Sequence, residues 1–162
     1  MQNRFVIWRQ SPYTSRVPIA KHKSRQIALQ VLFAWDATGT ADDSMAVNIA
    51  EEASADPDIR SRALDWARRA WELREMLDAK IEQLAPQWPP RRQPAVDRNI
   101  LRLAGWELLS TDTPPKVVID EAIELAKQFS TENSPAFVNG VLDAILREKQ
   151  GIATERPGDE TT

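Results

Sequence analysis

The apolar residues of this chain recur at the period of an α-helix along most of its 162 residues. Ile27, Val31 and Trp35 stand four residues apart and form one apolar stripe of a helix. We expect this helix to begin near Ser24, a favourable N-cap residue, and to end at Gly39. No segment shows the apolar–polar alternation of a half-buried strand. The pattern therefore predicts an all-α protein.

A proline-rich stretch divides the helical patterns into two groups. Residues 86–94 contain Pro89 and Pro90, which cannot continue a helix, so we place a linker there. The linker separates two predicted subdomains, at about 21–86 and 95–150, of one helical domain. The predicted helices after the first lie at about 43–54, 57–85, 97–110, 114–129 and 134–145. The expected fold is two packed helical bundles with six or seven helices in total.

The ends of the chain differ from its body in pattern and in charge. Residues 1–20 show no helical period, so we expect a flexible arm there and a disordered tail at 151–162. Residues 1–35 hold six basic residues and no acid, and since the whole chain carries −3, residues 36–162 carry −9. A basic end can neutralise phosphates, and an acidic body can receive a basic protein. Charge alone leaves nucleic-acid binding and an ordinary solvated tail both open.

The residue types present argue against catalytic, metal and membrane functions. The chain has no cysteine, which excludes disulfides, a thiolate nucleophile and Cys-based zinc sites. It has no glycine-rich phosphate loop, and its single histidine, His22, has no carboxylate nearby in the sequence. The acidic residues Glu121 and Glu124 fall on the polar face of a predicted helix, where solvation is the normal state. With neither a signal peptide nor a window near the ~18 apolar residues of a membrane span, we expect a cytoplasmic protein that is not an enzyme and needs no metal or cofactor.

Four sequence blocks form a characteristic set. The first is RQIALQVLF at 25–33. The others are DRNILRLAGWEL at 97–108, PKVVIDEAIELAK at 115–127 and FVNGVLD at 137–143. In this order and spacing, across about residues 21–148, they resemble the NusB family of transcription antitermination factors. Each block alone is moderately specific, and the four together make a strong resemblance.

The resemblance implies both a fold and a function. NusB proteins are all-helical, with two helical bundles side by side. They bind NusE, which is also a protein of the small ribosomal subunit, and the pair binds the boxA sequence of nascent RNA, above all in ribosomal RNA leaders. Bound there, the pair helps to hold RNA polymerase in a termination-resistant state. The expected partners are therefore single-stranded boxA RNA and NusE, with the polymerase complex contacted indirectly.

Two features depart from the family's pattern. The family's arginine-rich start is here Lys21, His22, Lys23, Ser24 and Arg25. Lysine contacts phosphate as a point charge, without the planar fork of arginine, so we expect RNA binding that is weaker or depends more on NusE. The arm before this basic segment is also longer than the family's usual start.

The first predicted helix carries most of the candidate RNA-binding residues. At its start, Lys21, His22, Lys23 and Arg25 can supply cations to phosphates, and the helix start itself attracts anions. A solvated charged turn is the alternative for this cluster. Gln30, on the polar face, can hydrogen-bond a base edge or a phosphate, or be ordinary surface.

The remaining RNA candidates combine an aromatic residue with the last helix. Phe33 falls off the apolar stripe, so it can stack on an unpaired base or anchor a protein, with core packing as the alternative. Asn133, Phe137 and Asn139 lie at and after the start of the last predicted helix. In the family this region joins the basic first helix in one RNA surface. For Asn139 a structural hydrogen bond is the alternative.

The NusE-binding surface is predicted from the same resemblance. Asp97 corresponds to a family position that faces NusE, although capping its own helix is an adequate alternative. Arg102 and Glu107 follow on the same predicted helix as weaker candidates. Phe33 is assigned to both surfaces.

Two other functions remain open at this point. NusB-like domains precede some ribosomal RNA methyltransferases and serve there as RNA-binding accessories. Those proteins continue into a large cofactor-binding domain, and residues up to 162 show none, so we favour the stand-alone factor. The other alternative is a helical protein-interaction adaptor without RNA affinity, against which the basic N-terminal segment argues weakly.

Overall fold

The computed structural model describes residues 18–151, and within that range all regular structure is helical. This confirms the predicted all-α fold. The helices are α1 Ile19–Thr38, α2 Asp43–Ala53, α3 Pro57–Glu72, α4 Arg74–Leu84, α5 Ala95–Ser110, α6 Pro115–Phe129 and α7 Ser134–Lys149, with a short 3-10 turn, η1, at Pro90–Arg92. Most of the arm predicted for 1–20 and of the tail predicted for 151–162 lies outside the described residues.

Helix α1 ends where the sequence predicts and begins earlier. Gly39 adopts the left-handed conformation, with φ of 75°, and its N–H donates to the carbonyl of Trp35, which closes the helix. The predicted N-cap at Ser24 is wrong, because α1 begins at Ile19 after Pro18. Ser24 is instead a buried residue inside α1, and its hydroxyl donates to the Ile59 carbonyl of α3.

The single helix predicted over 57–85 is in fact two helices. Leu73, with φ of −89° and ψ of −1°, separates α3 from α4. The Arg74 guanidinium donates to the Trp71 carbonyl at 2.9 Å and lies 4.1 Å from the centre of the Trp71 ring, so one side chain covers the break. No glycine or proline marks this position, so the sequence pattern carries no signal of the break.

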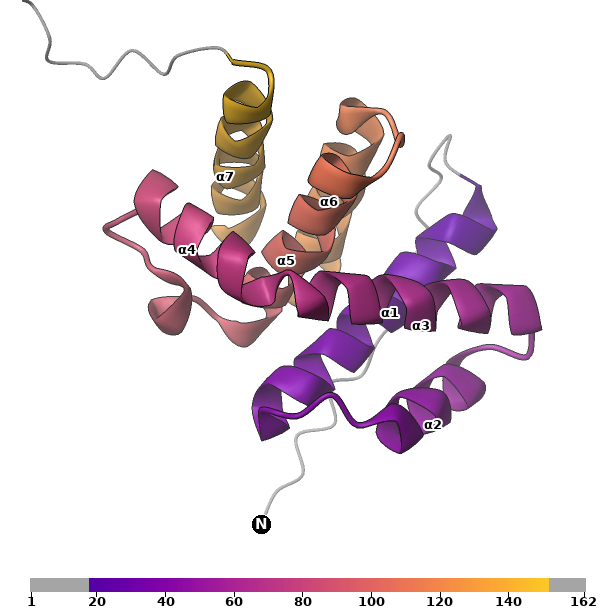
Figure 1. The fold of residues 1–162 in the computed structure, drawn as a ribbon. Helices are drawn as coiled ribbons and strands as arrows, with labels where there is room; N and C mark the ends of the chain where they lie inside the picture. The colour runs from indigo at the N-terminus through magenta and orange to yellow at the C-terminus, as the bar shows by residue number, and fades with distance from the viewer. Residues whose placement is uncertain (1–17, 152–162) are drawn as a thin grey trace, which may run out of the picture.

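The helices form two groups around α5 (Figure 1). Helices α1, α2 and α3 pack on one another, and α5, α6 and α7 pack on one another. Helix α4 falls within the predicted first subdomain. Besides its neighbours in sequence, α3 and η1, it contacts α5 and α7 of the second group. Because α5 touches α1, α3, α4, α6 and α7, it is buried around its circumference from Asn99 to Leu108. One hydrophobic core therefore runs through both groups.

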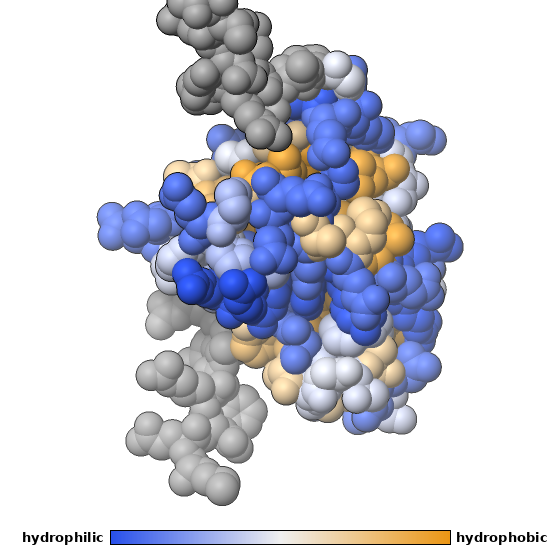
Figure 2. All heavy atoms as spheres, turned by 60° about the vertical axis from the view of Figure 1, so that its left-hand side comes forward, coloured by the Kyte–Doolittle hydropathy of each residue, from blue (hydrophilic) through white to orange (hydrophobic). Residues whose placement is uncertain are grey.

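Charged and polar side chains dominate the surface drawn in Figure 2, where hydrophobic side chains lie in small patches between hydrophilic ones. Within residues 18–151, the exposed large hydrophobic side chains are Ile19, Val47, Met76 and Trp88. They come from three different helices and one loop. None of the helices in this range is long and apolar enough to cross a membrane.

Two glycines inside helices should respond differently to alanine. A Cβ added at Gly140 meets no atom within 4 Å, whereas one added at Gly105 lies 3.0 Å from Leu77 Cδ2. We expect Gly140→Ala to raise the free energy of unfolding by about 1 kcal/mol, the difference in helix propensity. Gly105→Ala should gain less or lose stability, because Leu77 must move within the core. Urea denaturation measures both, and equal gains would contradict the packing at Gly105.

Candidate nucleic-acid interface

The start of α1 presents exposed positive charge. Lys21 is exposed and Lys23 is half-buried, and neither forms an ion pair with another residue of 18–151. The first turn of α1 contains no acidic residue, and no side chain caps its N-terminus. The positive end of the helix dipole therefore adds to the two lysine charges, and this end of the molecule can attract phosphates.

His22 and Gln26, on the same turns of α1, face helix α6. His22 Nδ1 lies 2.6 Å from Glu121 Oε2, and Gln26 Nε2 donates to Gln128 Oε1 at 3.1 Å and lies 3.2 Å from His22 Nε2. Glu121 is only 1% exposed, so the expectation that it is solvated is wrong. Its partner is 99 residues away, so sequence proximity could not reveal the pair.

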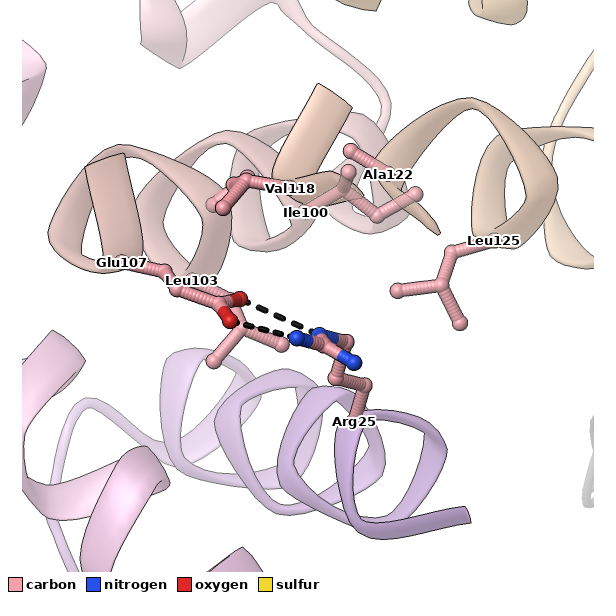
Figure 3. A pocket seen from close by; sticks show the side chains of 8 residues that line it. Arg25, Ile100, Leu103, Glu107, Val118, Ala122 and Leu125 are labelled. Carbon is pink, nitrogen blue, oxygen red and sulfur yellow. Dashed lines mark hydrogen bonds and ion pairs between the residues drawn. The ribbon is translucent and has the colours of Figure 1, made fainter. Parts of the chain in front are cut away.

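Arg25 is not part of the exposed cationic surface, and this corrects the prediction that it contacts RNA. Its side chain leaves α1 on the inner face and meets Glu107 of α5 (Figure 3). Nη2 donates to Glu107 Oε1 at 2.5 Å and Nε donates to Oε2 at 3.1 Å. Arg25 and Glu107 are each 2% exposed. A guanidinium held in this bidentate pair inside the protein fastens α1 to α5.

A small cavity adjoins the Arg25–Glu107 pair. Its volume is about 10 Å³, at the lower limit for one water molecule. Its other walls are the apolar side chains of Ile100, Leu103, Ala104, Val118, Ala122 and Leu125. Arg25 Nη1 lies 3.9 Å from Glu121 Oε2, so one guanidinium stands between two buried carboxylates. Arg25 therefore compensates the charge of Glu107 directly and lies within ion-pair distance of Glu121, which also contacts His22.

The turn between α6 and α7 is fixed on the first turn of α5 by Asp97. Ser134 Oγ donates to Asp97 Oδ2 at 2.8 Å, and the Ser130 hydroxyl donates to Oδ1. The backbone N–H of Thr131 donates to Ser134 Oγ. Asp97 is 3% exposed, which contradicts the prediction that it contacts NusE. The N-cap of α5 is Pro94, so the alternative that Asp97 caps its helix is also wrong. The turn leaves Asn133 exposed, together with Thr131 and Glu132.

The other candidates differ in their access to solvent. Asn139 is exposed on α7, and its side chain forms no hydrogen bond within residues 18–151, so the structural alternative finds no support there. Phe137 is half-buried and packs against the core. Gln30 and Phe33 are half-buried on α1, and Phe33 is not among the partly buried residues packed against the core. Asn133, Asn139 and Phe33 therefore remain available to a ligand.

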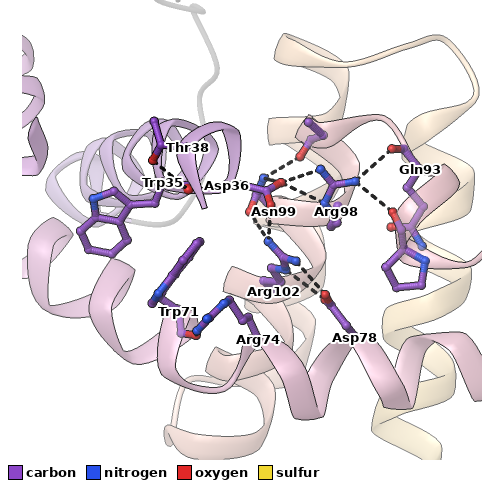
Figure 4. Close-up of polar contacts among 12 residues, drawn as sticks. Trp35, Asp36, Thr38, Trp71, Arg74, Asp78, Gln93, Arg98, Asn99 and Arg102 are labelled. Atoms are coloured by element: carbon purple, nitrogen blue, oxygen red, sulfur yellow. Dashed lines mark hydrogen bonds and ion pairs between the residues drawn. The ribbon is translucent and has the colours of Figure 1, made fainter. Parts of the chain in front are cut away.

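Arg102 and Glu107, the other predicted NusE contacts, form ion pairs inside the protein. Arg102 is 6% exposed, and its guanidinium pairs with Asp78 of α4 at 2.7 Å and with Asp36 of α1 at 3.1 Å (Figure 4). Glu107 holds Arg25. Burial and these pairs contradict a role for either side chain on an exposed protein-binding surface. The predictions failed because both residues lie on α5, which other helices cover on every side.

Arg98 and Asn99 complete the network around Asp36. Arg98 Nη2 donates to Asp36 Oδ2 at 2.6 Å and Asn99 Nδ2 donates to the same oxygen at 3.0 Å. Burial alone would raise the pKa of Asp36, but these hydrogen bonds and the charges of Arg102 and Arg98 outweigh it and lower the pKa below its ordinary value. Burial alone would lower the pKa of Arg102, but the carboxylates of Asp78 and Asp36 raise it above its ordinary value. The network joins α1, α4 and α5 and contributes no exposed group to the cationic end of α1.

The candidate residues that stay accessible are of the types that contact nucleic acids. Among residues 18–151, no three His, Asp or Glu side chains gather as a metal site. Along α7 the exposed carboxylates of Asp143 and Glu148 are paired with Arg147 and Lys80. The candidate groups that stay accessible are the cations of Lys21 and Lys23, the amides of Asn133 and Asn139 and the half-buried ring of Phe33. Such groups contact phosphates, base edges and base faces.

Comparisons with known proteins agree with this description. Residues 22–147 match the NusB family. The transcription antitermination protein NusB of Symbiobacterium thermophilum is 42% identical over 144 residues, covering 83% of this chain and 94% of that protein. The protein of the same name from Chloroflexus aggregans is 41% identical over 138 residues, covering 81% and 89%.

Solved structures show the same relationship. T. maritima NusB has a TM-score of 0.69 and 37% identity, covering 83% of this chain and 94% of that one. A chain in the crystal structure of antitermination factors NusB and NusE in complex with dsRNA has a TM-score of 0.73 and 29% identity, covering 82% and 99%. Because the family match spans most of the sequence and relatives at about 40% identity cover about four fifths of it, this chain belongs to the NusB family.

Proposed function

We propose that this protein is a transcription antitermination factor that binds boxA-type single-stranded RNA in nascent ribosomal RNA together with NusE. The bound pair supports termination-resistant transcription. The observation that carries the proposal is the pair of unpaired lysines, Lys21 and Lys23, at an uncapped helix start in a NusB-family chain. Support also comes from the similar crystal structure of antitermination factors NusB and NusE in complex with dsRNA.

The RNA surface that we propose combines α1 with α7. Lys21 and Lys23 contact phosphates, which gives affinity and salt dependence. The exposed amides of Asn133 and Asn139 contact base edges, and Phe33 stacks on a base or anchors NusE. His22, Gln30 and Phe137 are half-buried members of the same surface. The function is assembly of a complex and involves no catalytic step.

NusE extends this surface in the proposal. Since Asp97, Arg102 and Glu107 are buried, Phe33 is the predicted NusE contact that the fold leaves accessible. If NusE and RNA bind side by side and touch, each tightens the other by the same factor, because coupling between two ligands is reciprocal.

The experiment that tests the proposal is fluorescence anisotropy of labelled boxA RNA and of a scrambled control, titrated with the protein with and without NusE. We expect preferential boxA binding that tightens with NusE. Equal, weak binding to both RNAs under every condition would contradict the proposal and favour a general RNA accessory or a protein adaptor.

The double variant Lys21→Ala/Lys23→Ala should weaken boxA binding by roughly ten- to a hundredfold at low salt. Each phosphate contact with single-stranded RNA contributes about 0.7 to the slope of log affinity against log salt, so the slope should fall by roughly 1.4. The matched control is Lys116→Ala/Lys127→Ala, which removes two exposed lysine charges from α6. An unchanged slope in the α1 variant would remove these lysines from the RNA surface.

A further inference from the structure

Four of the six basic residues without an ion pair in residues 18–151 lie in one region of the protein. Most lysines and arginines in residues 18–151 form an ion pair with a carboxylate. Those without an ion pair in this range are Lys21, Lys23, Arg60, Arg62, Arg92 and Lys149. The first four stand at the starts of α1 and α3. Lys149 donates instead to the Leu108 carbonyl. Free positive charge is therefore shared between two helices that are distant in sequence.

Direct contacts bring the two helix starts together. Ser24 Oγ of α1 donates to the Ile59 carbonyl of α3 at 3.2 Å and accepts a hydrogen bond from Arg62 Nη1 at 3.3 Å. Arg62 is half-buried, with its guanidinium beside the turn that carries Lys21 and Lys23. In Figure 1 both helices begin at the right-hand side of the molecule. Thus α3 borders the start of α1 on one side, as α6 does on the other through Gln26 and Gln128.

The local charges favour an external anion for Arg62. Asp58 stands one turn earlier on α3 but forms no ion pair with Arg62, and its neighbour Asp56 caps the helix by accepting from the Asp58 N–H. Arg60 donates to the Ser54 carbonyl, which holds a second guanidinium on the same turn without neutralising it. A guanidinium with one neutral partner keeps donors for a phosphate, and its planar fork can bind two phosphate oxygens.

We propose that Arg62 of α3 is a phosphate-binding residue and that the RNA surface extends across α1 onto α3. The inference rests on the proposed RNA-binding function and adds a second helix to its surface. A single strand that lies over Lys21 and Lys23 reaches Arg62 on the side opposite to the α6–α7 turn. Arg62 lies outside the four sequence blocks that carry the family resemblance.

The test compares two variants that each remove one positive charge from α3. In boxA anisotropy titrations, Arg62→Gln should weaken binding roughly five- to tenfold at low salt and reduce the salt slope by about 0.7. The matched control Arg68→Gln removes an exposed arginine that is already paired with Asp43, and it should change affinity less than about twofold. Arg62→Lys should retain the salt slope while losing part of the affinity. Equal effects of Arg62→Gln and Arg68→Gln would overturn the inference.

A second measurement uses the unaltered protein, so it does not depend on the stability of any variant. Photocrosslinking to boxA RNA that contains 4-thiouridine should give adducts on the peptide from α3 that contains Arg62, besides those on α1. Adducts on α1 and α7 alone would overturn the inference. Loss of binding in Lys21→Ala/Lys23→Ala with no effect of Arg62→Gln would overturn this inference only, whereas a wild-type protein without boxA preference would overturn the proposed function as well.

Discussion

Replacing Arg25 by methionine is expected to lower the free energy of unfolding by about 3–5 kcal/mol, the usual loss when one partner of a buried ion pair is removed. Arg25 stands between the buried carboxylates of Glu107 and Glu121, so the substitution leaves two negative charges with reduced compensation inside the protein. Chemical denaturation at neutral pH measures the loss. This is the largest single effect that we expect. Methionine nearly fills the volume of the arginine side chain, so the loss is mainly electrostatic.

A double-mutant cycle separates the ion pair from the packing. The variant Arg25→Met/Glu107→Met removes both charges, and replacing a buried pair by apolar residues of similar size is often neutral or stabilising. We expect the double variant to be more stable than Arg25→Met alone. If the stability losses of Arg25→Met and Glu107→Met add up to the loss of the double variant, the two side chains do not interact as the structure shows.

Replacing Asp36 by asparagine should cost about 2–3 kcal/mol at neutral pH, because Arg98 and Arg102 then lose the carboxylate between them. Since folding lowers the pKa of Asp36, its contribution to stability is fully present above the pKa of an unfolded aspartate, about 3.9. The contribution disappears as the pH falls through the lower pKa of the folded state. The wild type and Asp36→Asn should therefore differ most at neutral pH and converge below about pH 4.

Urea denaturation of both proteins between pH 7 and pH 3 measures this convergence. The control is Asp143→Asn, which removes an exposed aspartate paired with Arg147 on the surface of α7 and should cost less than about 0.5 kcal/mol. A gap between wild type and Asp36→Asn that stays constant down to pH 3 would contradict the assigned role of the carboxylate.

The helices could be predicted from the sequence because their apolar period is local information. Gly39 ends α1 by a conformation that its own residue type favours, and the proline-rich segment before α5 interrupts the helices as expected. The break at Leu73 could not be predicted, because neither glycine nor proline stands there and the apolar pattern continues through it. Arg74, which stacks on Trp71 three residues before it, covers the break, but no residue type there signals it in the sequence.

The candidate site was predicted less completely, for a physical reason. Arg25 stands three residues before the buried Ala28 and seven before the buried Leu32, so helical spacing alone could have placed it on the inner face. Asp97 and Glu107 stand at the same spacings from the buried Ile100 and Ala104. Their partners Ser134 and Arg25, however, come from distant segments, so the local pattern does not reveal the contacts. A charged residue on a helix is exposed or buried according to which helix covers its face, and that depends on tertiary structure.

The enclosure of α5 means that neither half of this protein is an autonomous unit. A fragment ending before α5 would expose to water the apolar faces of α1 and α3 that α5 covers. A fragment beginning at α5 would leave Glu107 without Arg25, and Arg102 without Asp36 and Asp78. A protease cut in the proline-rich segment 86–94 would thus yield two pieces held together by a shared interior, and they would unfold in one cooperative transition.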